Sequence, residues 1–364
     1  MPTAKVHRIA AAAPDDVSGI AAAIAAGAID PTGVVAVFGK TEGNGLVNDF
    51  SRALATRALR DLMAAHVGAA STAHIAAVMS GGTEGGLAPH WLVFERAEAG
   101  SGPSPALAIG RAETADLPSE HLGAPEQAAS VAAGVRRAMA DAGIPDPSDV
   151  HFVQIKCPLL TAGRIAAAEA RGARVAIRDS LKSMGFSRGA SALGVAIALG
   201  EIDADAVAAE RIVVDRSLWS ANASTSAGIE LLNHEIVVLG MSAGWSGPLA
   251  IESAVMADGL DIEPVRAALA RLDLAAPGQL SAAQSERLVA LLAKAEASQS
   301  GWLRGRRHVM NDDSDVAATR HARAFVAGAL GSLVGHAEIY VSGGAEHQGP
   351  DGGGPVAVIA RREI

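Results

Sequence analysis

Short apolar runs separated by turn residues recur along the whole chain. Residues 34–38, 75–79, 107–111, 152–155, 235–239, 288–292 and 339–341 have the length and continuity of buried strands. Between these runs the sequence predicts helices over residues 18–26, 46–65, 125–142, 187–199, 262–272 and 315–330. Strands that alternate with helices predict an α/β fold.

One short pattern, Ser-x-Gly-x-Glu, occurs three times, at residues 80–84, 226–230 and 342–346. Each copy follows an apolar run that ends in a lysine, and an arginine directly after a hydroxyl residue stands between lysine and serine. A repeat of roughly 100 residues is too long for a solenoid. The sequence therefore predicts three pseudosymmetric α/β domains around a pseudo-threefold axis, with one central site. The three sets are Lys40, Arg52 and Ser80; Lys156, Arg188 and Ser226; and Lys294, Arg320 and Ser342.

Breaks rich in glycine and proline at residues 101–105 and 246–248 separate the repeats. The predicted units are 1–102, 111–247 and 253–364. In the second unit, Ser242 competes with Ser226 as the repeated serine. We choose Ser226 because a glutamate follows it four residues later and a predicted strand comes soon after.

Composition narrows the classes of function. A net charge of −9, 3% aromatic residues and no basic stripe argue against a nucleic-acid partner. No apolar stretch is long enough to span a membrane, and the N-terminus lacks the layout of a signal peptide. The single cysteine, Cys157, fits a reducing compartment, and we interpret it as a small buried hydrophobic residue. We expect a cytoplasmic protein that binds neither membranes nor nucleic acid.

The repeated residues suit nucleophilic catalysis at a shared pocket. A lone lysine at a strand end is usually solvated, and a lone Ser-Gly-Gly is usually a turn, but three matched sets favour one site. A serine becomes a nucleophile when a base takes its proton, and lysine is the residue that recurs with it here. Crowded cations lower the pKa of a buried lysine, N–H groups of the Ser-Gly turns stabilise an oxyanion, and arginine forks bind carbonyl oxygens.

Local sequence favours one of the three pairs. Lys40 and Lys294 are each followed two residues later by a glutamate, whereas Lys156 is followed by Pro158. A nearby carboxylate favours the ammonium form of lysine. We therefore predict Lys156 as the base and Ser226 as the nucleophile.

Other ligand-binding patterns in the sequence give weaker evidence of function. Residues 39–41 resemble the end of a P-loop, but Val34 stands where the first glycine belongs. No HExxH motif or cysteine cluster supports catalytic zinc. Glu296 with carbonyls of the loop at 349–350 is a candidate oxygen-only site for Mg²⁺ or Ca²⁺. A non-enzymatic binder of small molecules and a nucleotide-dependent enzyme stay open as other classes of function.

The motifs GKTEGNG, SGGTEGG, FSRGAS, SAGIE and SGGAEHQGPDGGG span the whole chain and resemble those of the cyanuric acid hydrolase/barbiturase family of cyclic amide hydrolases. The resemblance implies three α/β domains with four-stranded sheets, hydrolytic ring opening of an s-triazine trione or a related pyrimidine, and a homotetramer. It assigns Ser226 as nucleophile and Lys156 as its base. The residues that we expect to bind substrate are Arg52, Ser80, Gly81, Arg188, Ala227, Arg320, Ser342, Gly343, Lys40 and Lys294.

The resemblance also implies a structural Mg²⁺ or Ca²⁺ and no organic cofactor. We expect cyanuric acid rather than barbituric acid as substrate, because its three identical edges match three intact sets. The product would be carboxybiuret, which loses CO₂ to give biuret. Val316, four residues before Arg320, is our predicted specificity residue. The expected metal ligands are Glu296, Ala345, Gln348, Gly349, Pro350 and Gly353, and we do not assign His347 to the metal.

Overall fold

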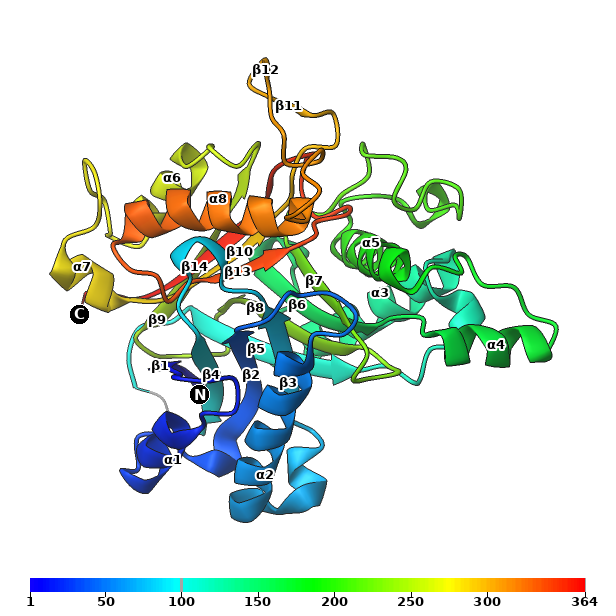
Figure 1. The fold of residues 1–364 in the computed structure, drawn as a ribbon. Helices are drawn as coiled ribbons and strands as arrows, with labels where there is room; N and C mark the ends of the chain where they lie inside the picture. Colours follow the sequence, from blue (N-terminus) through cyan, green and yellow to red (C-terminus); the bar gives the residue numbers. More distant parts are fainter. Residues whose placement is uncertain (99–100, 364) are drawn as a thin grey trace.

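Three four-stranded sheets with one shared strand order make up the fold, which a computed structural model describes for residues 1–98 and 101–363 (Figure 1). In every sheet the order is first, fourth, second and third strand of the unit. The second and third strands run parallel, and the fourth runs antiparallel to both of its neighbours. The sheets are β1 (Thr3–Ala10), β4 (His90–Ala97), β2 (Val34–Thr41) and β3 (Ala76–Gly81); β5 (Ala106–Glu113), β8 (Glu235–Ser242), β6 (Val150–Pro158) and β7 (Ala223–Gly228); and β9 (Leu249–Met256), β14 (Gly354–Arg361), β10 (Leu288–Ala295) and β13 (Tyr340–Gly343).

Two starts of the predicted units differ from the sheets. Residue 111 lies inside β5 and residue 253 lies inside β9, so the second and third units begin earlier than predicted. Both strands follow a proline that ends the preceding break, Pro105 and Pro248. Residues 99–100 of the predicted first unit and Ile364 of the third lie outside the described residues.

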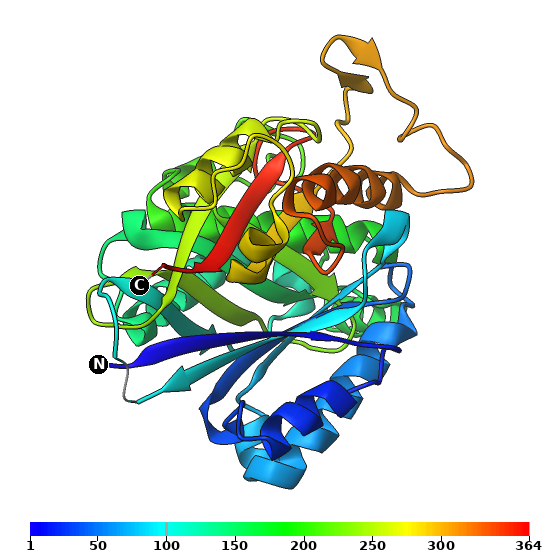
Figure 2. The same ribbon diagram turned by 90° about the vertical axis from the view of Figure 1, so that its left-hand side faces the viewer.

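The helices lie on the outer faces of the sheets (Figures 1 and 2). Helix α2 packs on β2 and β3, α3 and α5 pack on the second sheet, and α6 and α8 pack on the third. Among the described residues, no helix is both long and apolar enough to cross a membrane. The helices are α1 (Ser18–Ala25), α2 (Phe50–Thr72), α3 (Pro125–Ala142), α4 (Ala162–Ala170), α5 (Ser180–Leu199), α6 (Glu263–Arg271), α7 (Ala282–Arg287) and α8 (Ala318–Val334).

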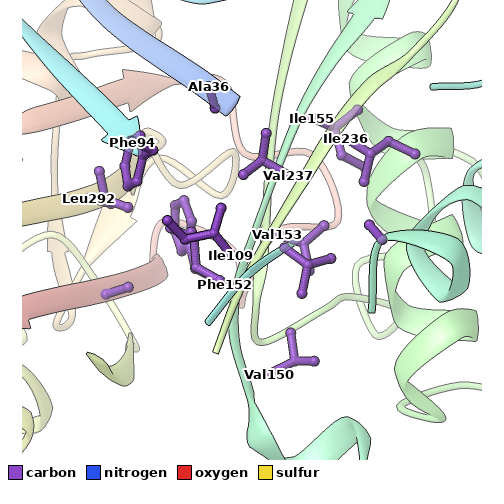
Figure 3. Close-up of a cluster of buried hydrophobic side chains, with 14 of the residues drawn as sticks. Ala36, Phe94, Ile109, Val150, Phe152, Val153, Ile155, Ile236, Val237 and Leu292 are labelled. Carbon is purple, nitrogen blue, oxygen red and sulfur yellow. The ribbon is translucent and has the colours of Figure 1, made fainter. Parts of the chain in front are cut away.

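The inner faces of the three sheets share one hydrophobic core. Strand residues alternate between the two faces, so Phe38 of β2 joins the central core while Val37 packs outward against α1 and α2. The Phe38 ring lies 4.6 Å from the ring of Phe94 and 5.7 Å from that of Tyr340 in the third sheet, measured between centroids. Figure 3 shows Phe94 and Leu292 meeting at this core. The sheets are therefore fixed to one another at the axis of the molecule.

Two helices, α5 and α8, begin at residues other than those that the sequence analysis predicted. Helix α5 starts at Ser180, because the Asp179 carboxylate accepts a hydrogen bond from the Lys182 N–H, so Arg188 lies in its third turn and not its first. Helix α8 starts at Ala318, after a turn in which the Asp313 carboxylate accepts from the N–H groups of Asp315 and Val316, and its N-cap residue, Ala317, provides no side-chain cap. Before α8, the short hairpin β11 (Trp302–Leu303) and β12 (Arg306–Arg307) projects from the body (Figure 2).

Candidate active site

The strand register places each repeated lysine directly beside the repeated serine of its own unit. Lys40 of β2 is the register partner of Ser80 on β3, and the other two units repeat this pairing. In β2, Ala36 and Phe38 face the central core, and the period of two gives Lys40 the same direction. The lysines are at most 1% exposed. The other two pairs are Lys156 with Ser226 on β6 and β7, and Lys294 with Ser342 on β10 and β13.

The three pairs are alike in register but not in hydrogen bonding. Lys40 Nζ donates to Ser80 Oγ at 3.3 Å, and Lys294 Nζ donates to Ser342 Oγ at 3.3 Å. Lys156 Nζ instead donates to the Met79 carbonyl at 2.9 Å and forms an ion pair with a Glu230 carboxylate oxygen at 2.7 Å. One set in three therefore departs from the symmetry.

The serines and their following residues line one small cavity at the axis. Ser226 Oγ lies 3.1 Å from Ser342 Oγ across this cavity, so the units meet here. The lysines lie behind the serines and are not among the lining residues, which means that Lys40 and Lys294 reach a ligand only through their serines. The lining residues are Gly45, Arg52, Met79, Ser80, Gly81, Met184, Arg188, Ser226, Ala227, Arg323, Ser342 and Gly343.

The third arginine that lines the cavity is Arg323. The prediction that Arg320 binds substrate there is therefore wrong by one helical turn. Arg323 is 3% exposed and lines the cavity, whereas the Arg320 side chain is 38% exposed and contacts Glu84 from the outer side. The hydroxyl-arginine pattern selected residue 320, one helical turn too early. The apolar stripe of α8 gives the missed signal, since residues 327, 330 and 334 share a face with Arg323.

Each arginine reaches from its own unit into the next. Arg188 contacts both oxygens of Glu346 at 2.7 and 2.6 Å, and Arg323 contacts both oxygens of Glu84 at 2.8 and 2.7 Å. Arg52 donates to the Ala227 carbonyl at 3.0 Å instead. Three guanidinium groups therefore surround one small cavity, two of them held by bidentate carboxylates.

Burial sets the protonation of the central lysines. Burial lowers the pKa of Lys156 and the Glu230 carboxylate opposes this effect, while burial and then Arg323 hold the pKa of Lys40 well below its usual range. Burial raises the pKa of Glu230, but the charges of Lys156 and Arg52 outweigh it and lower that pKa to about 2. The sequence argument that Lys156 lacks a carboxylate neighbour is therefore wrong, because the carboxylate comes from the loop after β7.

The predicted specificity residue lies outside the inner cavity. Val316 precedes α8 and so does not share a helix face with Arg320. The residues that follow it, 317–319, line a wider cavity at the mouth of the site together with Leu181, Phe186 and Gln299. Val316 therefore lies next to the wider cavity at the mouth of the site and not next to the three arginines of the inner cavity.

The candidate metal site lies in a separate cavity of about 310 Å³ beside the loop between β13 and β14. Of the predicted ligands, Glu296, Ala345 and Gly349 line it, and Pro350 and Gly353 belong to the same loop. Gln348 turns its side-chain oxygen to the Thr225 N–H at 2.7 Å. Burial, and then the Glu346 charge, raises the pKa of the partly buried Glu296 to about 8. The described residues hold no group of three or more His, Cys, Asp or Glu side chains that could bind a metal, so carbonyl oxygens would have to complete the site.

The fold and the site define an enzyme built from three related units, whose serines, lysines and arginines gather around one pocket. A sequence profile described as "Amidohydrolase ring-opening protein" matches residues 5–361. The chain belongs to this family.

Relatives in the family are similar over their full length. A cyanuric acid amidohydrolase from Azorhizobium caulinodans is 65% identical over 366 residues and one from a Bradyrhizobium species is 61% identical over 371, each covering 100% of both chains. The crystal structure of the Azorhizobium caulinodans hydrolase matches with a TM-score of 0.94, 65% identity and 100% coverage of both chains. A second solved cyanuric acid hydrolase, described as an innovation by structural concatenation, matches with a TM-score of 0.94 at 46% identity, covering 99% of this chain and 100% of that one.

Proposed function

We propose that the chain is a cyanuric acid amidohydrolase that opens the triazine ring with a Ser-Lys pair. The observation that carries the proposal is the threefold set of lysine-serine register pairs and arginines around one cavity. Cyanuric acid presents three identical carbonyl edges, and three guanidinium groups suit their oxygens. The names of the relatives support the same substrate.

Ser226 acts as the nucleophile and Lys156 as its base. The neutral amine of Lys156 takes the Ser226 hydroxyl proton, the oxygen bonds to a ring carbonyl carbon, and Arg52, Arg188 and Arg323 hold the carbonyl oxygens. The ring C–N bond breaks, and the leaving nitrogen takes the proton from Lys156. Water then attacks the acyl carbon, Lys156 takes a water proton, and the proton returns to the Ser226 oxygen. The released carboxybiuret loses CO₂ to give biuret.

Two differences between the sets support the choice of this pair. Ser226 is 7% exposed, against 5% for Ser80 and 3% for Ser342, so it is the most accessible of the three to a ligand. Lys156 pairs with a carboxylate, whereas Lys40 and Lys294 bond their own serines, so the second set is the one that departs from the symmetry. Only one serine can attack a bound ring at a time, so a working site needs one set that differs from the other two.

Assays with cyanuric acid and with barbituric acid distinguish a cyanuric acid hydrolase from a barbiturase and from a binding protein. Purified protein is expected to convert cyanuric acid into biuret and CO₂, with barbituric acid a poor substrate or an inhibitor. Product analysis by mass spectrometry, with each compound as the sole substrate, measures this directly. Preferred opening of barbituric acid would make the protein a barbiturase, and tight binding of cyanuric acid without turnover would make it a binding protein.

A hard cation such as Mg²⁺ or Ca²⁺ would be held by Glu296 and loop carbonyls, including those of Ala345 and Gly349. Bound there, the cation would supply positive charge beside Glu296 and stabilise the loop after β13. We expect that adding either ion to chelator-treated protein raises its Tm, and that Glu296→Gln removes this response. The measurement is thermal unfolding at matched ionic strength. An equal Tm with and without both ions would contradict the metal site.

The homotetramer that the resemblance implies stays a prediction, which sedimentation velocity tests.

A further inference from the structure

The three repeated glutamates adopt two different arrangements. Glu84 and Glu346 each bind an arginine from another unit through both oxygens. Glu230, the third copy, contacts Lys156 of its own unit at 2.7 Å. The first arrangement leaves the lysine of the unit free to bond its serine, as Lys40 and Lys294 do. Among the described residues, no hydrogen bond joins Lys156 to Ser226.

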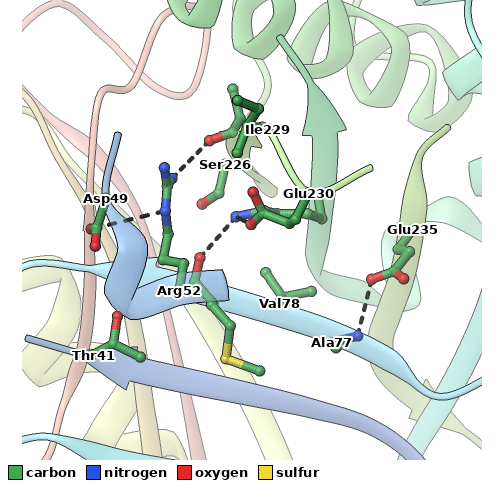
Figure 4. Close-up of polar contacts among 12 residues, drawn as sticks. Thr41, Asp49, Arg52, Ala77, Val78, Ser226, Ile229, Glu230 and Glu235 are labelled. Atoms are coloured by element: carbon green, nitrogen blue, oxygen red, sulfur yellow. Dashed lines mark hydrogen bonds and ion pairs between the residues drawn. The ribbon is translucent and has the colours of Figure 1, made fainter. Parts of the chain in front are cut away.

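The arginine that would match Glu230 is present and is held by other groups. Arg52 donates to the carbonyls of Ala227 and Leu46, and its Nε lies 3.9 Å from the Asp49 carboxylate. That Nε is buried and has no hydrogen-bond partner among the described residues. Figure 4 shows Arg52, Ser226 and Glu230 grouped at this point of the site. Leaving a buried donor without a partner costs free energy, so the Arg52 Nε–H is a hydrogen-bond donor available to a carboxylate.

The charges around Lys156 come from every element that packs against it. Glu230 follows β7, Arg52 belongs to α2, and Glu235 of β8 is the register partner of Lys156. Burial raises the pKa of Glu235 to about 7, and its oxygens accept from the Ala77 N–H and from Arg60. The Cys157 thiol points to the opposite face of β6, where it bonds Ser187 and Ser191 of α5, and the charge of Glu230 acts on Arg164. Of these groups, Glu230 is the one in ion-pair contact with the amine.

We propose that Glu230 exchanges partners between Lys156 and Arg52, and that this exchange frees Lys156 to take the proton of Ser226. The proposal rests on the Lys156/Ser226 pair proposed above. Paired with Glu230, the amine is a cation and cannot act as a base. When Glu230 turns to Arg52, as Glu84 and Glu346 do to their arginines, the buried ammonium loses its counter-charge and gives its proton to solvent, which reaches the 15% exposed Glu230 side chain. Glu230 is thus a positioning residue.

The exchange explains how one set of three is selected for catalysis. Glu84 and Glu346 already bind their cavity arginines through both carboxylate oxygens, and the further contact of Glu84, with Arg320, is again to an arginine and not to the lysine of its own unit. Their units hold the lysine-serine contact permanently and serve as binding positions. Of the three repeated glutamates, Glu230 is the one that pairs with the lysine of its own unit while the matching arginine, Arg52, stands nearby.

The test is the pH dependence of kcat at saturating substrate in paired variants. Glu230→Gln removes the anion, so Lys156 loses its proton more easily and the acid limb of kcat moves to lower pH by about one unit or more. Arg52→Met removes the alternative partner, keeps Glu230 on Lys156, and moves the limb to higher pH. In the Glu230→Gln background, Arg52→Met gives a smaller upward shift, because no carboxylate is left to exchange and only the direct effect of the Arg52 charge on Lys156 remains.

Glu84→Gln is the matched control, since Glu84 binds Arg323 in the same way but does not contact Lys156. We expect the acid limb of kcat in this variant to coincide with that of the wild-type protein. If ionisation of the substrate caused the limb, all variants would share it. An equal Arg52→Met shift in both backgrounds would overturn the exchange, because it would show a direct effect of the Arg52 charge. An unmoved limb in Glu230→Gln while Ser226→Ala is inactive would reject the exchange alone. A limb that moves only in Glu84→Gln would instead reject Lys156 as the base.

Discussion

Replacing Ser226 by alanine is expected to lower kcat by a factor of about 10⁴ to 10⁶, the range seen when an enzyme loses its nucleophile. The change removes the attacking oxygen and one hydrogen bond, to Ser342, and leaves the three arginines in place. Cyanuric acid should therefore still bind. The loss of turnover is measured by biuret formation, and binding of the intact ring by isothermal titration calorimetry.

Ser80→Ala and Ser342→Ala are the controls for this result. Each removes an equivalent hydroxyl that contacts its own lysine. We expect losses of about 10- to 100-fold, in line with one or two lost hydrogen bonds to the ligand. A Ser80→Ala or Ser342→Ala variant as inactive as Ser226→Ala would show that the nucleophile is not unique. A Ser226→Ala variant with substantial turnover would rule out the covalent route through this residue.

Replacing Arg323 by methionine is expected to raise KM by about 10- to 100-fold, because a charge-assisted hydrogen bond to a carbonyl oxygen of the ring is lost. Glu84 keeps a partner in this variant, since Arg320 contacts the same carboxylate at 3.1 Å. The fold should therefore survive the change. Steady-state kinetics with cyanuric acid give the KM, and thermal unfolding checks the fold.

Arg320→Met is the matched control, one helical turn away. Its side chain is 38% exposed, and surface ion pairs contribute about 1 kcal/mol or less. We expect its KM to stay within about threefold of the wild-type value. A larger effect from Arg320→Met than from Arg323→Met would return the third binding position to Arg320.

The threefold repetition of matched lysine, arginine and serine residues made the core of the site predictable from sequence, and the strand periodicity seen in the structure explains why. A lysine at the end of a buried strand, in phase with inward residues such as Phe38, has to point at the interior wherever the sheet is covered on both faces. Three such lysines with matched serines therefore indicated a common centre before any coordinates. The threefold arrangement of sheets follows from the same repeat.

The features that the sequence analysis missed depend on contacts between segments far apart in the chain, which short sequence patterns do not reveal. Arg320 and Arg323 lie one helical turn apart, and the packing of α8 on the third sheet decides which of them faces the cavity. The pairing of Glu230 with Lys156 is a choice between two cations from different units. Neighbours two residues apart along a strand, such as Glu42 after Lys40, gave no guide to that choice, since Glu42 is exposed.

The reach of two lysines across unit boundaries limits how such a protein can arise. Lys156 holds the carbonyl before Ser80 in the first unit, and Lys294 holds the carbonyl before Ser226 in the second. A single module therefore lacks the group that fixes its own serine strand and relies on the copy that follows. Divergence of one copy toward chemistry, with the others kept for recognition, becomes open to selection only after the copies share one polypeptide, because identical modules in a trimer must all change together.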